Sequence, residues 1–133
     1  MTVNLIKRFW PSLIVVAVIL YATLWPDPAG IDNFPAIPHL DKLIHAIMFG
    51  GLAGALAFDA TRWRGLGELT PWHMAVVCIA SALFGGVIEV VQEAMGLGRG
   101  CDVFDFCADA VGTIVAFFTA PSAIRAVLRS KQK

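Results

Sequence analysis

The side chains of this sequence that could do chemistry gather in three short segments. The segments are DKLIHAIMF at 41–49, GGVIEVVQE at 85–93 and GRGCDVFDFCAD at 98–109. In a helix, residues four apart lie on one face, so each segment can present a pair of ionisable groups on one side. If the three segments are helix ends that meet, these pairs converge on one cleft. The pairs are Asp41 with His45, Glu89 with Glu93, and Asp105 with Asp109.

A histidine among carboxylates is suited to proton transfer. His45 can act as a general acid or base at neutral pH, and Glu89 or Asp105 can hold its imidazole in the correct tautomer. We therefore name His45, Glu89 and Asp105 as candidate catalytic residues. The sequence contains no Gly-x-Ser-x-Gly elbow, no HExxH motif and no glycine-rich phosphate loop. It therefore names no reaction, and whether the protein is an enzyme stays open.

Two basic side chains close to these carboxylates are candidates for binding an anion. Lys42 and Arg99 can hold the phosphate of a head group, and an arginine can do so through a bidentate contact. We place Gln92 in the same head-group-binding set. Asp41 and Asp109 complete the candidate site as supporting residues.

A divalent cation is the one cofactor for which these residues offer ligands. It could bridge Asp105, Glu89 and the phosphate of a head group, because hard cations favour carboxylate oxygens. The spacing selects no metal. We therefore predict no other cofactor and leave the identity of the metal unassigned.

Several polar residues near these segments also have a structural explanation. Asp41 and Asp102 can be N-caps of the helices that follow them, since a carboxylate accepts hydrogen bonds from N-terminal amides and is favoured by the helix dipole. For Asp102 we favour the cap. Glu93 is equally well explained as a solvated carboxylate at the membrane interface, and His73 as an interfacial residue.

His45 and Glu89 fall about one helical turn inside the predicted membrane. A charged side chain there costs free energy unless water or a partner compensates it, and such residues are rare. A salt-bridged clamp between helices is the structural alternative. We favour a functional role for both residues.

The composition predicts that these segments belong to a membrane protein. The chain has 133 residues, 58% of them hydrophobic and 15% charged, and a mean hydropathy of +0.74, which exceeds the range of soluble domains. Its length fits a single domain covering residues 1–133. The formal net charge is zero, so no overall basic field would attract nucleic acid, and we predict no nucleic-acid partner.

Four apolar stretches predict an all-α bundle of four transmembrane helices. They cover approximately 10–25, 43–60, 74–91 and 103–120, each close to the roughly 20 residues that a spanning helix requires. Pro11 suits a first helical turn, Thr70 followed by Pro71 suggests a cap, and Pro121 either closes the fourth span or kinks it. We expect the first stretch to be a retained helix rather than a cleaved signal peptide, because no A-x-A-like site follows it.

Basic residues predict the orientation of the four spans. Lys7 and Arg8 precede the first span, Arg62 and Arg64 lie between the second and third, and Arg125 and Arg129 follow the fourth. The positive-inside rule places these segments, and both termini, in the cytoplasm. The three polar segments then lie together at the outer face, near the head groups of the lipid bilayer.

Small residues at four-residue spacing predict close contacts between the helices. Such spacing lets helix backbones approach one another within a membrane. Packing within one bundle is the simpler interpretation, and the oligomeric state stays undetermined. The residues are Gly50 and Gly54, then Ser81 and Gly85 or Ala82 and Gly86, and finally Ala108, Gly112 and Ala116.

The three cysteines form no CxxC motif, so the sequence does not predict a zinc knuckle or a thioredoxin-like site. Cys78 falls in an apolar run and is expected to be a small core residue. Cys101 and Cys107 could pair in an oxidising compartment, but a helix that begins between them would hold them apart.

At the same residues the sequence resembles the VanZ-like family, small bacterial membrane proteins named for an accessory factor in resistance to the glycopeptide teicoplanin. Three matching pieces occur in the family's order, DKLIHAIMFGGLAG at 41–54, FGGVIEVVQ at 84–92 and GRGCDVFDFCADAVGTIVA at 98–116. They cover the second, third and fourth spans. The family pattern falls on Asp41, Lys42, His45, Phe49, Glu89, Gln92, Arg99, Asp105, Asp109 and Gly112.

The resemblance implies a role in the bacterial cell envelope, in the cytoplasmic membrane, with the polar residues on the periplasmic or extracellular face. Combined with the charged residues, it leaves two hypotheses. The first is an outward-facing site that binds or acts on an anionic phospholipid or polyprenyl-linked cell-wall intermediate, with an effect on teicoplanin susceptibility. The second is a non-catalytic helper whose polar residues lock the helices together. A transporter is a more distant third, because the short spans lack paired broken helices.

Overall fold

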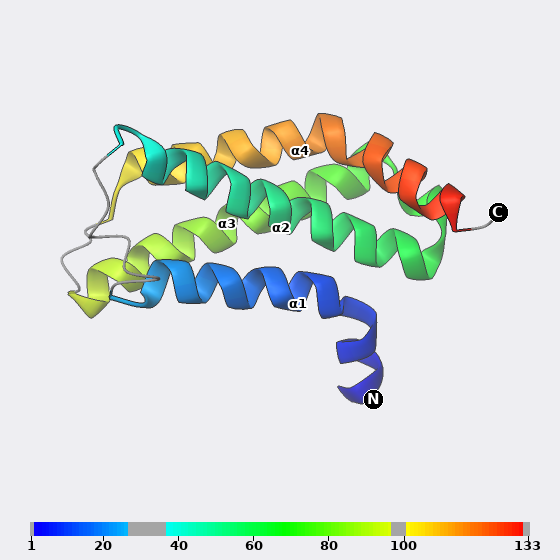
Figure 1. The fold of residues 1–133 in the computed structure, drawn as a ribbon, viewed down its shortest axis with the longest axis horizontal. Coiled ribbons are helices and arrows are strands. Elements are labelled where there is room, and N and C mark those ends of the chain that lie inside the picture. Colours follow the sequence, from blue (N-terminus) through cyan, green and yellow to red (C-terminus); the bar gives the residue numbers. More distant parts are fainter. Residues whose placement is uncertain (1, 27–36, 97–100, 132–133) are drawn as a thin grey trace.

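The computed structural model describes residues 2–26, 37–96 and 101–131, and it contains four long helices (Figure 1). No strand occurs within these ranges. The all-α prediction is confirmed, and each helix is long and apolar enough to cross a membrane. The helices are α1 Thr2–Leu24, α2 Leu40–Arg64, α3 Pro71–Met95 and α4 Val103–Ser130, with a short 3₁₀ helix, η2, at Leu66–Glu68.

Successive helices run in opposite directions along the bundle (Figure 1). The N-terminal ends of α2 and α4 lie beside the C-terminal ends of α1 and α3 (Figure 1). The first residues of α1, the α2–α3 connection and the last residues of α4 gather at the opposite end. The predicted grouping of the three basic segments at one end is therefore present, whereas the side of the membrane on which they lie stays a prediction.

Local sequence explains where the helices begin and end. Thr70 caps α3 by accepting a hydrogen bond from the backbone N–H of His73, and Pro71 follows in the first turn, as predicted. Asp102 caps α4, again as predicted, by accepting from Phe104 N–H. Gly96 ends α3 in the left-handed conformation that glycine adopts without strain.

The prediction that Asp41 caps α2 is wrong. His39 is the N-cap, with φ at 63° and no capping hydrogen bond from its side chain, and the helix begins at Leu40. Asp41 consequently lies in the first helical turn, where its carboxylate is still favoured by the helix dipole. Its side chain is then available to pair with Lys42.

Pro121 does not end α4, which continues to Ser130. An interior proline lacks an N–H and its ring presses on the carbonyl four residues earlier, yet Pro121 lies within a helix that continues for nine more residues, to Ser130. The fourth helix is therefore longer than the span that the hydropathy of the sequence predicts.

α1 is bent near its start. Phe9 has non-helical angles, φ −114° and ψ 21°, and the residues before it turn away from the bundle (Figure 1). Pro11 explains the bend, because it lacks an N–H and its ring clashes with the carbonyl four residues earlier. The part of α1 that lies along the bundle therefore begins close to Trp10, where the sequence predicts the first span to start.

Close contact between α2 and α4 organises the bundle. A side chain at Gly50 would lie 2.6 Å from the carbonyl oxygen of Gly112, and one at Gly112 would collide with the backbone of Ala46. The two backbones therefore touch, as the spacing of small residues predicts. On either side, Ile19, Phe49, Leu52 and Ile88 form one apolar cluster, and residues including Ala53, Ala57, Met74 and Ala116 form another.

The outer surface of the bundle is strongly apolar. Trp72, Phe104 and Phe118 are each at least 70% exposed, and many other large apolar side chains point outward. Soluble proteins rarely expose apolar surface on this scale. With four helices of spanning length, this surface is that of a multi-pass membrane protein.

Candidate functional site

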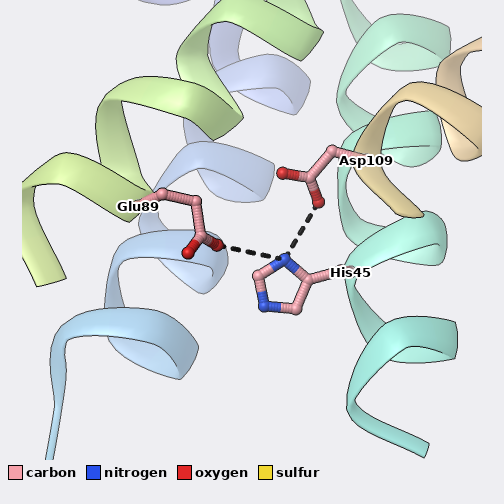
Figure 2. A group of neighbouring side chains, drawn as sticks. All are labelled: His45, Glu89 and Asp109. Carbon is pink, nitrogen blue, oxygen red and sulfur yellow. Dashed lines mark hydrogen bonds and ion pairs between the residues drawn. The ribbon is translucent and has the colours of Figure 1, made fainter. Parts of the chain in front are cut away.

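His45 lies between two buried carboxylates at the centre of the polar end of the bundle (Figure 2). Its Nδ1 is 2.9 Å from Asp109 Oδ1 and 3.9 Å from Glu89 Oε1. Its Nε2 lies 3.8 Å from Asp105 Oδ2. Three helices thus meet at one imidazole, α2 through His45, α3 through Glu89 and α4 through Asp105 and Asp109.

Two glycines allow Asp109 to reach this position. Gly112 lies one turn after Asp109 and lets α4 contact the backbone of α2 at Ala46, the residue next to His45. On α3, a side chain at Gly85 would collide with Asp109 Oδ2. Asp109 therefore fills the space that the missing side chain of Gly85 leaves, and none of its surface is exposed.

Glu89 is held by the start of α4. Its Oε2 accepts a hydrogen bond of 3.0 Å from the backbone N–H of Asp102, the residue that caps α4. Its Oε1 is buried and has no hydrogen-bond partner, as is also true of Asp109 Oδ2. The site therefore contains carboxylate oxygens that are withdrawn from solvent without a donor, which is costly in free energy.

Lys42 lies on α2 about one turn nearer the end of the bundle than His45, and carboxylates surround it. Its Nζ is 2.9 Å from Asp41, 3.2 Å from Asp105 and 3.4 Å from Asp102. Its three ammonium hydrogens are thus matched by three acceptors. The hydrogen bond from Phe104 N–H, followed by the charge of Lys42, lowers the pKa of Asp102 below its ordinary value.

The described part of this cluster has an excess of negative charge. Asp41, Glu89, Asp102, Asp105 and Asp109 supply carboxylates, whereas Lys42 and the imidazole of His45 are the basic groups among the described residues that contact them. Arg99, predicted to bind a head group, lies outside the described residues. The cluster as described is thus better suited to receive a cation than a bare anion.

The remaining predicted site residues lie at the edges of the cluster. Gln92 is buried and donates from Nε2 to the carbonyl of Thr23 over 2.9 Å, so it connects α3 to α1. Glu93 is exposed and accepts a hydrogen bond from Cys101 N–H. His73 lies at the other end of the bundle, where its Nδ1 is 2.8 Å from the carbonyl oxygen of Glu68.

A further buried carboxylate was not among the predicted site residues. Asp59 of α2 is fully buried near the basic end, and its Oδ2 accepts hydrogen bonds from both the N–H and the hydroxyl of Ser12 on α1. Arg62 Nη2 lies 3.3 Å from Asp59 Oδ1. An acidic residue inside the apolar stretch 43–60 was the available signal, because such a residue needs a partner at membrane depth.

In the part of the chain that the structure describes, two sets of side chains bring potential metal ligands together. In each set, one ligand atom from each residue lies within 4.8 Å of the others. The first set is His45, Glu89 and Asp109, all buried, and the second is Asp41, Asp102 and Asp105, which are more exposed. Cys78 is buried, whereas Cys101 and Cys107 are exposed, and all three thiols are free.

Comparison of the chain with family models, with curated proteins and with solved structures finds no match. The candidate function therefore depends on the geometry of the site and on the sequence motifs.

Proposed function

We propose that this membrane protein binds the phosphate head group of an anionic lipid, or of a lipid-linked cell-wall precursor, at the α2–α3–α4 end of the bundle. The observation that carries the proposal is the convergence of Lys42, His45 and buried carboxylates from three helices at one end of a bundle of spanning length. Ionisable groups at this depth are costly to insert, which favours a functional use for them.

Lys42 provides the first contact with phosphate. The Asp102 carboxylate is the most distant of its three partners, at 3.4 Å, and a phosphate oxygen can take its place on the ammonium group. The excess of carboxylates then requires a further positive charge near the phosphate. A divalent cation shared between the carboxylates and the phosphate supplies that charge.

His45 is the group that would move a proton if the bound head group reacts. A carboxylate only accepts hydrogen bonds, so in the site without a metal ion ionised Asp109 fixes the hydrogen of His45 on Nδ1, and Nε2 is then the nitrogen free to accept a proton. In this scheme Asp109 orients the imidazole, a role that the sequence analysis gave to Glu89 or Asp105. The reaction itself is not assigned.

Membership of the VanZ-like family, a place in the bacterial cytoplasmic membrane and an effect on teicoplanin susceptibility remain part of the proposal. They are supported by the motifs at 41–54, 84–92 and 98–116. The predicted outward orientation would bring the cluster to the leaflet from which lipid-linked wall precursors are used.

A structural lock is the second candidate function, and specific contacts favour it. Lys42 joins α2 to the start of α4, Glu89 joins α3 to the same point, and Gln92 joins α3 to α1. In that case the polar groups would hold the bundle together for a partner protein, and a bound lipid would not be needed.

Lipid analysis of the purified protein separates the two candidates. We expect one class of phosphate-bearing lipid to be enriched over its share of the membrane, as measured by mass spectrometry. In Lys42→Ala and Glu89→Gln that enrichment is expected to fall at least about tenfold, because a contact to a charged group contributes about 1.5–3 kcal/mol.

His73→Ala, at the opposite end of the bundle, is the matched control and should retain the wild-type lipid. Abundance in the membrane and thermal unfolding of each variant must be measured in parallel. If the variants lose folded protein in step with the lipid, the lock is favoured. A wild-type protein whose bound lipids match the bulk membrane would contradict the head-group site.

A further inference from the structure

Two buried carboxylate oxygens at the centre of the polar cluster lack a hydrogen donor. They are Glu89 Oε1 and Asp109 Oδ2, on side chains that are 2% and 0% exposed. Buried polar atoms are normally satisfied, and a charged oxygen without a donor is especially costly. A cation beside His45 would satisfy Glu89 Oε1, which faces the imidazole, whereas Asp109 Oδ2 points toward Gly85.

The distances around His45 match those of a metal site. Nδ1 is 2.9 Å from Asp109 Oδ1 and 3.9 Å from Glu89 Oε1, and the three potential ligand atoms lie within 4.8 Å of one another. Two ligands at about 2.1 Å from one ion can be at most about 4.2 Å apart. At the tetrahedral angle they lie about 3.4 Å apart, so side-chain movements of about an ångström complete the triangle.

Asp105 lies where a residue that supports a metal-bound histidine would lie. Its Oδ2 is 3.8 Å from Nε2 of His45, on the opposite side of the ring from Glu89 and Asp109. A histidine that binds a metal through one nitrogen usually donates its other N–H to a carboxylate, which fixes the ring. Asp105 supplies that carboxylate, on the same helix as Asp109.

The second acidic set is less suitable for a cation. Asp41, Asp102 and Asp105 all lie within 3.4 Å of the Lys42 ammonium group, which already neutralises part of their charge. A metal ion there would have to approach that ammonium group. The deeper set has only an imidazole at its centre, and an imidazole can be a ligand itself.

We propose that His45, Glu89 and Asp109 bind a divalent transition-metal ion, such as Zn²⁺ or Mn²⁺, with Asp105 holding the ring of His45. This inference rests on the proposed function, since it names the cation that joins the cluster to a phosphate. One imidazole and two carboxylates favour these ions over Mg²⁺ and Ca²⁺, which prefer oxygen ligands alone. Three protein ligands leave a coordination position for a phosphate oxygen.

Metal binding can be measured directly on the full-length protein in detergent. After chelation and desalting, we expect one equivalent of Zn²⁺ or Mn²⁺ to bind and to raise the unfolding temperature, with Mg²⁺ binding at least about a hundredfold more weakly. X-ray absorption of the Zn²⁺ form should show nitrogen and oxygen ligands and no sulfur. This readout needs no variant, so it remains decisive if substitutions in the site prevent folding.

Substitutions locate the ion. His45→Gln, Glu89→Gln and Asp109→Asn should each weaken binding by at least about tenfold, and Asp105→Asn by a similar factor because it supports a ligand. His73→Gln and Glu68→Gln are the matched controls, a histidine and a partly exposed carboxylate at the other end of the bundle, and both should bind as the wild type does.

Absence of stoichiometric Zn²⁺ or Mn²⁺ binding by the wild type, sulfur in its ligand shell, or full affinity in folded His45→Gln would each overturn the metal site. The same preparations are analysed for lipid. Metal binding without lipid enrichment would contradict the proposed head-group function and leave the metal site intact. Lipid enrichment that depends on Lys42 but not on a transition metal would contradict the metal site and leave the head-group function intact.

Discussion

Two carboxylates within the described ranges, those of Asp59 and Asp109, are completely buried, and their surroundings differ. Asp59 accepts two hydrogen bonds from Ser12 and lies beside Arg62. Asp109 faces His45 with one oxygen, and its other oxygen has no hydrogen-bond partner. Asp59 Oδ1 also lacks a hydrogen-bond partner, but it lies 3.3 Å from Arg62 Nη2, whereas Asp109 Oδ2 faces Gly85.

The bend in α1 explains why Asp59 is needed. In an unbroken helix Ser12 N–H would donate to the carbonyl of Arg8. Here Ser12 N–H donates instead to Asp59, and the Arg8 carbonyl accepts from Arg62 and Trp63 of α2. Both halves of the broken backbone bond are thus replaced by side chains of the neighbouring helix.

We therefore predict that Asp59→Ala destabilises the protein by about 1–3 kcal/mol, because it leaves the buried N–H of Ser12 without an acceptor. Asp59→Asn should cost less, since its amide oxygen can still accept. Thermal unfolding in detergent measures both effects. Thr119→Ala removes an exposed hydroxyl that bonds within its own helix and is the control. A cost for Asp59→Ala no larger than that of the control would mean that Asp59 does not hold α1.

The sequence predicted which residues gather but not how each is used. His45, Glu89, Asp105 and Asp109 could be placed together because helical spacing and the alternation of spans determine which helix ends meet. The partner of Gln92 could not be predicted, because it depends on how α1 rotates against α3. Asp59 was missed since its partners exist only where Pro11 breaks α1.

At the scale of helices, the α2–α4 contact decides whether the site forms. The Gly112 backbone lies against the backbone of Ala46. This contact brings together Asp109, one turn before Gly112, and His45, the residue next to Ala46. The spacing of small residues predicted this kind of contact. It could not identify the partner helix, because Gly50, Gly85 and Gly112 occur on three different helices and any pair of them could have met.

A glycine comparison tests this contact. Gly112→Ala places a methyl group against the Ala46 backbone, which cannot move as a side chain can, so we expect α4 to shift and stability to fall by about 1–3 kcal/mol. Gly51→Ala, next to the contact on α2, has nothing within 4 Å of the added carbon and should be neutral or slightly stabilising. Thermal unfolding of both variants gives the comparison. Equal stability of the two would contradict the close approach.

Helix boundaries show where local sequence was sufficient. Thr70 and Asp102 were predicted as caps because their side chains act on backbone groups two or three residues away. The end of α4 was not predicted correctly, because hydropathy falls after Ala120 while the helix continues through Pro121. A hydropathy window measures where a helix leaves the membrane, and helical geometry can persist beyond that point.

In the molecule as a whole, a group of basic side chains lies at one end of the bundle and the carboxylate cluster lies at the other. Arg8, Arg62 and Arg64 lie at the end that holds both termini, and the carboxylates around Lys42 lie at the other (Figure 1). By the positive-inside rule the basic end is cytoplasmic, which would direct the polar cluster outward. The proposed ligand depends on this orientation, since it determines which leaflet supplies the head group.

Cysteine labelling tests the orientation. Cys101 is exposed just before α4 at the polar end, and Cys78 is buried. Cys107 is exposed as well, so the experiment uses a Cys107→Ala chain. We expect a membrane-impermeant maleimide to label this chain in spheroplasts and the added Cys101→Ala to remove most of that label. Ser130→Cys, made in the chain without Cys101 and Cys107, moves an exposed thiol to the other end and should react only after permeabilisation. If Cys101 reacts only after permeabilisation and Ser130→Cys reacts without it, the His45 cluster faces the cytoplasm. The ligand to look for would then be a lipid of the inner leaflet.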